Sequence, residues 1–255
     1  MRPVSREDAD RLDAIRRANQ RRRVSVVEAF DLTPHMRRVV FRELEPSACE
    51  PARPAEWIKL HVPTCGQGKK HGRAYTIRER REGQLSIDMA LHGGLCASWA
   101  RRARPGDLAE VSGPRPGCKL AWPPGNVVLG VDETGLSAVA SILANLPRQT
   151  RGIVWLEVPD ARDIQHIEAP PAVSVRFLPR KMTPQGQLLI QAMREAPVSP
   201  AAAVWVAAER AAALELREHF ETMLPRERVH TSGYWRMPFS QSGDSSAFSA
   251  KTRAA

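Results

Sequence analysis

The run Arg73-Ala74-Tyr75-Thr76 places a cation, an aromatic ring and a hydroxyl within four residues. On an extended segment successive side chains alternate between faces, so Arg73 and Tyr75 point one way and the Thr76 hydroxyl points the other. A cation can hold a diphosphate, a ring can cover an isoalloxazine, and a hydroxyl can bond to its nitrogen edge, so the run suits a bound flavin. The alternative is an ordinary strand with a cross-strand charge and a half-buried tyrosine.

Length and hydropathy bound the class of protein. A chain of 255 residues has room for two modest domains with real cores. The longest convincing apolar run, residues 201–208, has the length of a strand and not of a membrane span. The charged N-terminus lacks the apolar stretch of a signal peptide. We therefore expect a cytoplasmic protein that does not insert into a membrane.

The net charge of +10 suggests an anionic partner. The basic residues are scattered along the chain as arginine pairs and are not interleaved with aromatics, and the chain has only two tyrosines and six phenylalanines. An anionic small ligand or a redox partner explains the charge as well as a nucleic acid does, and charge alone does not separate these interpretations. We expect no nucleic-acid partner.

The cysteines show no spacing typical of a zinc or iron–sulfur site, so we expect separate, reduced thiols. They are Cys49, Cys65, Cys96 and Cys118. His61, Cys65 and His71 are close together in a Gly/Lys-rich segment that could in principle bind a metal. A solvated loop is favoured because no fourth ligand is evident, and we predict no metal site.

Hydrophobic periodicity predicts two domains. Residues 1–21 form a charged leader, most of it in a helix predicted over residues 5–23. From Val24 the period is two, and six short antiparallel strands suggest a closed barrel over residues 22–122. The predicted strands are residues 24–30, 36–41, 57–62, 73–80, 84–91 and 107–112.

The pattern changes after the Pro/Gly-rich residues 122–125, which we take as the domain boundary. Over residues 126–238 strands alternate with helices, which predicts a parallel sheet covered by helices. The strands are predicted at 126–131, 152–157, 172–177, 202–208 and 228–231, and the helices at 135–146, 184–194 and 209–223. Residues 239–255, rich in Ser and Ala, are predicted to be disordered.

Further short motifs follow the Arg73 run in a fixed order. They are Leu85 to Gly94, Ala97-Ser98-Trp99-Ala100, Pro105-Gly106-Asp107, Gly113 to Gly117, Asp132-Glu133-Thr134, Glu157 to Asp160 and Ser232 to Arg236. From about Arg22 to Arg236 the set resembles the siderophore-interacting proteins, a branch of the ferredoxin-NADP reductase superfamily that contains flavin-dependent ferric-siderophore reductases. The resemblance implies a six-stranded antiparallel FAD-binding β-barrel followed by a parallel α/β domain of the NAD(P)-binding type.

The resemblance also implies a set of site residues. Tyr75 and Thr76 would be catalytic, beside the flavin, and Arg73 would hold its diphosphate. The loop before Ala97 is shorter here than is usual in the family, so phosphate contacts from its amides are a weaker expectation than the contact from Arg73. The full set of cofactor-binding residues is Arg73, Ala74, Tyr75, Thr76, Asp88, His92, Ala97, Ser98, Trp99, Thr134 and Trp235.

Four of these residues have alternative interpretations. Asp88 and His92, at i and i+4, would lie beside the flavin, or Asp88 would pair with an arginine across the strands and His92 would end a strand. Thr134 would touch the flavin or cap the helix that follows, and capping is favoured. Trp235, with Tyr234, would look toward the flavin face or be a core aromatic.

The implied activity is reduction of ferric siderophores by a monomeric enzyme. NADPH, NADH or a reduced ferredoxin would charge FAD, which would pass single electrons to the Fe(III) chelate and so release Fe(II). Basic residues around the cleft would attract anionic chelates: Lys59, Lys69, Lys70, Arg78 and Lys181. The alternatives are a flavin oxidoreductase of the same superfamily that acts on a protein or quinone, and a basic binding module without catalysis.

Overall fold

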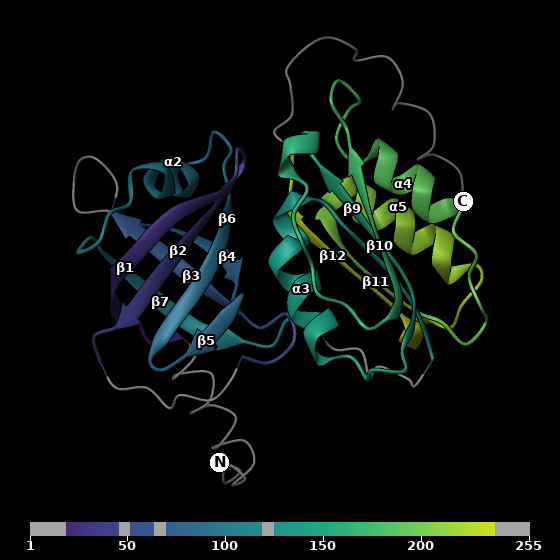
Figure 1. Ribbon diagram of the computed structural model, residues 1–255, viewed down its shortest axis with the longest axis horizontal. Coiled ribbons are helices and arrows are strands. Elements are labelled where there is room, and N and C mark those ends of the chain that lie inside the picture. The colour runs from purple at the N-terminus through teal and green to yellow at the C-terminus, as the bar shows by residue number, and fades with distance from the viewer. Residues whose placement is uncertain (1–18, 46–51, 64–69, 119–124, 238–255) are drawn as a thin grey trace, which may run out of the picture.

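The computed structural model describes residues 19–45, 52–63, 70–118 and 125–237, which form two domains (Figure 1). Most of the predicted leader and the predicted disordered tail lie outside the described residues. The predicted helix over residues 5–23 is wrong at its end, because Arg22 and Arg23 are the first residues of a strand. Their alternation with buried Val24 and Val26 fits a strand that has one face in the core.

The first domain is one antiparallel sheet of seven strands in the order β4-β3-β7-β1-β2-β6-β5. The sheet curls, so that β4 at one edge contacts β6 near the other, and the interior is filled by side chains such as Phe41, Ile58, Leu60, Leu85 and Ile87. The strands are β1 (Arg22–Thr33), β2 (Met36–Glu43), β3 (Trp57–Pro63), β4 (Lys70–Thr76), β5 (Glu79–Arg81), β6 (Gln84–Ala90) and β7 (Leu108–Arg115).

The strand predicted over residues 73–80 is two strands. The amide of Ile77 leaves the ladder and donates to the Glu56 carbonyl at 2.8 Å, and the amide of Arg78 donates to the Ser86 carbonyl at 2.9 Å. This change of partner turns the chain from the β3 side of the barrel to the β6 side. The barrel therefore has seven strands where six were predicted, and helix α2 (Leu95–Arg102) lies over one end of it (Figure 1).

The second domain is a parallel sheet of five strands in the order β10-β9-β8-β11-β12, as the alternating pattern predicted. Helix α3 covers one face, and helices α4 and α5 cover the other (Figure 1). The strands are β8 (Asn126–Val131), β9 (Arg151–Val158), β10 (Ala172–Pro179), β11 (Ala203–Glu209) and β12 (Val229–Trp235). The helices are α3 (Leu136–Asn145), α4 (Gln187–Arg194) and α5 (Arg210–Glu221), with one-turn 3-10 helices at η1 (Glu133–Gly135), η2 (Ala161–Asp163) and η3 (Arg226–Arg228).

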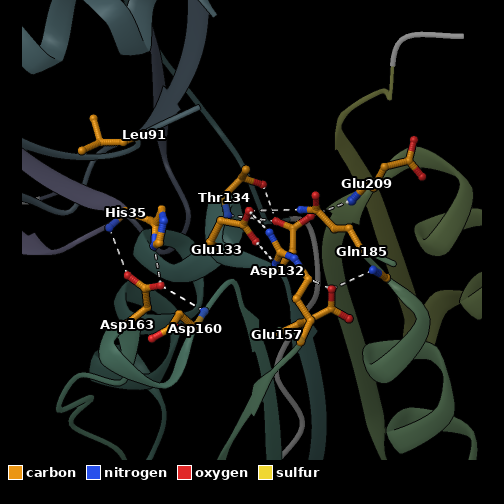
Figure 2. Close-up of polar contacts among 12 residues, drawn as sticks. His35, Leu91, Asp132, Glu133, Thr134, Glu157, Asp160, Asp163, Gln185 and Glu209 are labelled. Atoms are coloured by element: carbon orange, nitrogen blue, oxygen red, sulfur yellow. Dashed lines mark hydrogen bonds and ion pairs between the residues drawn. The ribbon is translucent and has the colours of Figure 1, made fainter. Parts of the chain in front are cut away.

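The two domains share a core and polar contacts. Met36, Ala55 and Ala90 of the barrel belong to the same apolar cluster as α3 and one face of the parallel sheet. The Asp163 carboxylate accepts from the His35 backbone amide at 3.0 Å and lies 2.8 Å from the His35 ring (Figure 2). These contacts fix the carboxyl edge of the parallel sheet beside the barrel.

Candidate functional site

Arg73 is an exposed cation on β4. Its one hydrogen bond among the described residues runs to the neighbouring Gly72 carbonyl at 3.2 Å, and within the described ranges no carboxylate pairs with it. Its charge lies close enough to Cys96 and His92 to lower the pKa of both groups. At Cys96 the charge opposes burial, which raises the pKa of the thiol. At His92 it adds to burial, which lowers the pKa of the imidazole. Arg73 is therefore free to hold an anion at the start of α2.

Helix α2 begins at Leu95, within the segment whose amides were expected to contact the phosphates. The amides of residues 95–97, in the first turn, have no carbonyl partner within the helix. The N-cap residue is Gly94, which has no side chain that could accept a hydrogen bond from them. The Ser98 amide donates to the Gly94 carbonyl at 2.8 Å and is used within the helix. An anion at this end of α2 would therefore meet the amides of residues 95–97, Ala97 among them, and not that of Ser98.

His92 lies between α2 and the α/β domain. The Gly94 amide donates to its Nδ1 at 2.9 Å, so the neutral ring carries its proton on Nε2. Burial lowers the pKa of His92, the carboxylate of Glu133 in the second domain opposes this, and the charges of Arg101 and Arg73 add to it. A neutral His92 presents one N–H donor near the Arg73 cation.

Tyr75 and Thr76 continue β4 toward the second domain, after the exposed Ala74. Tyr75 is half-buried against the barrel core, and burial raises the pKa of its hydroxyl, which hydrogen-bonds with the Cys96 thiol. Thr76 is 7% exposed and its side chain hydrogen-bonds with the Tyr234 hydroxyl of β12. Burial raises the pKa of Tyr234 to about 12, so this contact between the domains is made by two neutral hydroxyls.

Asp132, at the end of β8, is the centre of a polar network at the carboxyl edge of the parallel sheet (Figure 2). Its carboxylate accepts from the Thr134 amide at 2.9 Å, the Thr134 hydroxyl at 2.6 Å, the Glu209 amide at 2.9 Å and the Trp235 indole at 2.8 Å. Asp132 is 1% exposed, and burial, with the neighbouring Glu133 charge, raises its pKa to about 6.

This network bears on two of the predictions. Thr134 was expected to cap a helix, but the N-cap of η1 is Asp132, and the Thr134 amide donates to the Asp132 carboxylate. The Trp235 indole is anchored on Asp132, and a contact between its ring and the flavin stays a prediction. Tyr234 is the terminal aromatic beside β4, edge-on to the buried Trp205 with ring centroids 6.5 Å apart.

A second set of carboxylates lies at the same edge (Figure 2). Both Glu133 oxygens lie 2.8 Å from the Arg180 guanidinium, and Gln185 donates to one of them at 3.2 Å. Glu157, fully buried, accepts from the amides of Gly186 at 2.7 Å and Leu189 at 2.9 Å. Burial raises the pKa of Glu157, although these amides and Arg180, 3.7 Å away, favour its charged form.

Asp88 pairs with an arginine across the strands, which is one of the two alternatives that the sequence left open. Its oxygens accept from the Arg38 guanidinium at 2.6 and 2.9 Å, from the neighbouring strand β2, and Arg78 lies 3.9 Å away. Strand β6 ends at Ala90, so His92 lies in the turn beyond it and not on one strand face with Asp88. A contact between Asp88 and a cofactor stays a prediction.

Trp99 packs on the barrel. Its ring stacks on Phe41 with centroids 6.2 Å apart and planes 7° apart, which gives it a role in the barrel wall; a contact with a cofactor stays a prediction. Of the predicted basic residues, Lys70 pairs with Glu110 and Arg78 faces Asp88, whereas Lys59 and Lys181 are exposed. Lys69 lies outside the described residues.

Two further observations concern metals and membranes. Among the described residues no three His, Cys, Asp or Glu side chains gather as metal ligands would, and Cys96 and Cys118 form no disulfide; Cys49 and Cys65 lie outside those residues. In the same ranges none of the helices is long and apolar enough to cross a bilayer.

Comparison with protein families assigns the fold to a known group. Residues 66–118 match the model of the siderophore-interacting FAD-binding domain, and residues 124–238 match the model of the siderophore-interacting protein. The chain belongs to the siderophore-interacting protein family. The first match contains Arg73, Tyr75, Thr76 and the start of α2, and the second contains the whole parallel sheet.

Individual relatives agree with this assignment. The chain is 28% identical over 173 residues to ferric vibriobactin reductase ViuB of Vibrio cholerae, with 64% of each chain covered. It is 27% identical over 187 residues to ferric acinetobactin reductase of Acinetobacter baumannii, with 70% of this chain and 65% of the relative covered. A siderophore utilization protein from T. fusca has the same fold, with a TM-score of 0.78, 27% identity, and 88% of this chain and 95% of that chain covered. The match spans less than two thirds of the length of either reductase.

The residues of this chain fit the FAD that the family's barrel binds. A flavin dinucleotide needs a cation or free amides for its diphosphate, and a ring and donors for its isoalloxazine. Arg73 is an unpaired exposed cation within the described ranges, and residues 95–97 offer helix amides beside it. Tyr75 supplies a neutral, half-buried ring on the same strand.

Proposed function

We propose that this protein is an FAD-dependent ferric-siderophore reductase that releases Fe(II). The observation that carries the proposal is the position of Arg73, Tyr75 and Thr76 on one strand, between the free end of α2 and the second domain. The matching FAD-binding domain and the two relatives named as ferric-chelate reductases support it.

The residues of β4 and α2 would hold FAD. Arg73 and the amides of residues 95–97 would bind the diphosphate, and Tyr75 would cover the isoalloxazine. Thr76 and Tyr234 would lie at the redox edge, where two neutral hydroxyls can donate without adding charge. When bound, FAD would take up two electrons and give them singly to Fe(III).

The ferric chelate would be the substrate. Hard oxygen ligands prefer the trivalent ion, so reduction weakens the chelate and releases Fe(II). Exposed Lys59 and Lys181 carry charge that would attract anionic chelates. The donor proposed from the fold is NADH, NADPH or a reduced ferredoxin.

The test is an anaerobic assay of Fe(II) with a ferrous trap, in which purified protein with bound FAD is supplied with a ferric siderophore and a donor. We expect Fe(II) to form in proportion to protein, and Arg73→Ala, purified without flavin, to lose this activity. The proposal fails if the FAD-loaded protein reduces quinones or protein acceptors rapidly while every ferric siderophore tested keeps its iron. A colourless protein that cannot bind FAD would support the binding-module alternative.

A further inference from the structure

Asp163 is a buried acid of the α/β domain that is hydrogen-bonded to the barrel. It lies in η2, and its side chain is 4% exposed. One carboxylate oxygen accepts from the His35 backbone amide at 3.0 Å; the other lies 2.8 Å from His35 Nδ1 and accepts from the Asp160 amide at 3.2 Å. Burying a carboxylate is costly unless such bonds replace its water. The bonds that compensate the burial of Asp163 are thus also bonds that hold His35.

His35 connects this contact to a neighbouring segment of the barrel. It lies in the turn between β1 and β2, and its carbonyl accepts from the Leu91 amide at 2.8 Å. His35 therefore lies between Asp163 and Leu91 (Figure 2). The next residues, Met36 and Ala90, pair across β2 and β6 and belong to the apolar cluster of α3. Polar and apolar contacts together fix Leu91 relative to the α/β domain.

Leu91 is the first residue of the loop that leads to the start of α2. His92, Gly93 and Gly94 follow it, and Gly94 is the N-cap of the helix. Two adjacent glycines give a loop many conformations unless other contacts restrict it. Arg101 of α2 donates to the Leu91 carbonyl at 3.0 Å, and the Gly94 amide donates to His92 Nδ1 at 2.9 Å. The position of Leu91 thus helps to set where the His92 ring and the free amides of α2 lie.

We propose that Asp163 is a positioning residue for FAD. It acts through His35 and Leu91, which hold the loop at the start of α2 in the arrangement that binds the diphosphate. The α/β domain thereby contributes to FAD affinity through a turn of the barrel. The inference rests on the proposed function, because it concerns the same FAD site. By linkage, bound FAD strengthens the contact between Asp163 and His35 by the same factor.

The first test is the Kd for FAD of Asp163→Ala, measured by quenching of flavin fluorescence. Coupling between two sites is typically about 5- to 150-fold, so we expect the Kd to rise about fivefold or more. The matched control is Ser141→Ala. The Ser141 hydroxyl accepts from the Ala55 amide at 2.7 Å, so it also joins the two domains, but away from the loop that follows Leu91. Equal Kd values in the two variants would overturn the proposal.

A second readout separates positioning from a loss of stability. Phosphorus NMR of bound FAD reports on the diphosphate, and visible absorption reports on the isoalloxazine. We expect the phosphorus resonances to shift in Asp163→Ala and not in Ser141→Ala, while the flavin bands stay as in the wild type. Asp163→Asn keeps an oxygen that can accept from the His35 amide, so it should largely restore the resonances. Wild-type resonances in Asp163→Ala would show that Asp163 supports only the fold.

The remaining outcomes are also decisive. If Asp163→Ala does not fold, His35→Ala takes its place, because it removes the ring contact and keeps both backbone hydrogen bonds of residue 35. We expect it to shift the same resonances, and unshifted resonances would contradict the proposal. If the wild type binds FAD and neither variant changes the Kd or the resonances, only the positioning role fails. If the wild type binds no FAD, the proposed function itself fails.

Discussion

Replacing Arg73 by alanine should weaken FAD binding by about one to two orders of magnitude. Within the described ranges Arg73 has no carboxylate partner, so its loss disturbs no ion pair of the protein. A hydrogen bond to a charged group contributes about 1.5–3 kcal/mol, which corresponds to about 10- to 150-fold in Kd. The dissociation constant can be measured by titrating flavin-free protein with FAD and following the quenching of flavin fluorescence.

Two variants sharpen this measurement. Arg73→Lys keeps the charge but loses the planar fork, so its Kd should lie between those of wild type and Arg73→Ala. Arg81→Ala makes the same substitution on exposed β5, at the end of the barrel opposite α2, and should leave the Kd unchanged (Figure 1). An Arg73→Ala protein that binds FAD as tightly as Arg81→Ala does would refute the assignment of the diphosphate site.

Three other properties can be predicted from the structure. Thr76→Ala should keep FAD bound but shift its two-electron potential by about 20 mV, the equivalent of about 1 kcal/mol for one hydrogen bond, and an unshifted potential would make Thr76 an ordinary strand residue. Folding raises the pKa of Asp132 from 3.8 to about 6. The contribution of Asp132 to the free energy of unfolding is therefore complete below the unfolded-state pKa and is lost as the pH rises through the folded-state pKa. Urea unfolding should show wild type losing up to about 3 kcal/mol relative to Asp132→Asn between about pH 4 and about pH 7; parallel pH profiles would contradict the raised pKa. Binding of an anionic ferric chelate, followed by tryptophan quenching without a donor, should weaken with salt while binding of a neutral chelate does not; equal, salt-independent binding would mean that the basic surface does not select the substrate.

Local sequence predicts the parts of the fold that depend on periodicity. Leu85, Ile87 and Met89 alternate along β6, and their side chains fill the barrel. The continuous apolar run of β11 predicts a parallel strand that is buried on both faces, as it is in the structure. The split between β4 and β5 depends on the Glu56 carbonyl, which is distant in sequence, so the predicted strand count was one too low.

The site was predicted less completely, because its contacts join distant segments. The pairing of β12 with β11 shifts between Ala208 and Glu209, which sets Glu209 opposite Trp235 and passes over Tyr234. That shift sends Trp235 to Asp132 and leaves Tyr234 beside Thr76, and no pattern in the chain indicates it. The sequence shows Glu157 and Glu209 as acidic residues but does not show that they accept from backbone amides at the starts of α4 and α5. These contacts form only at the edge of the folded sheet.

The central claim is that electrons pass from FAD in this protein to the iron of a ferric siderophore. The most direct measurement mixes FAD-loaded protein, reduced chemically and freed of excess reductant, with a ferric siderophore and a ferrous trap without oxygen. We predict that the oxidised flavin spectrum returns and that two Fe(II) ions form for each FAD. Flavin that stays reduced while the chelate keeps its Fe(III) would contradict the account.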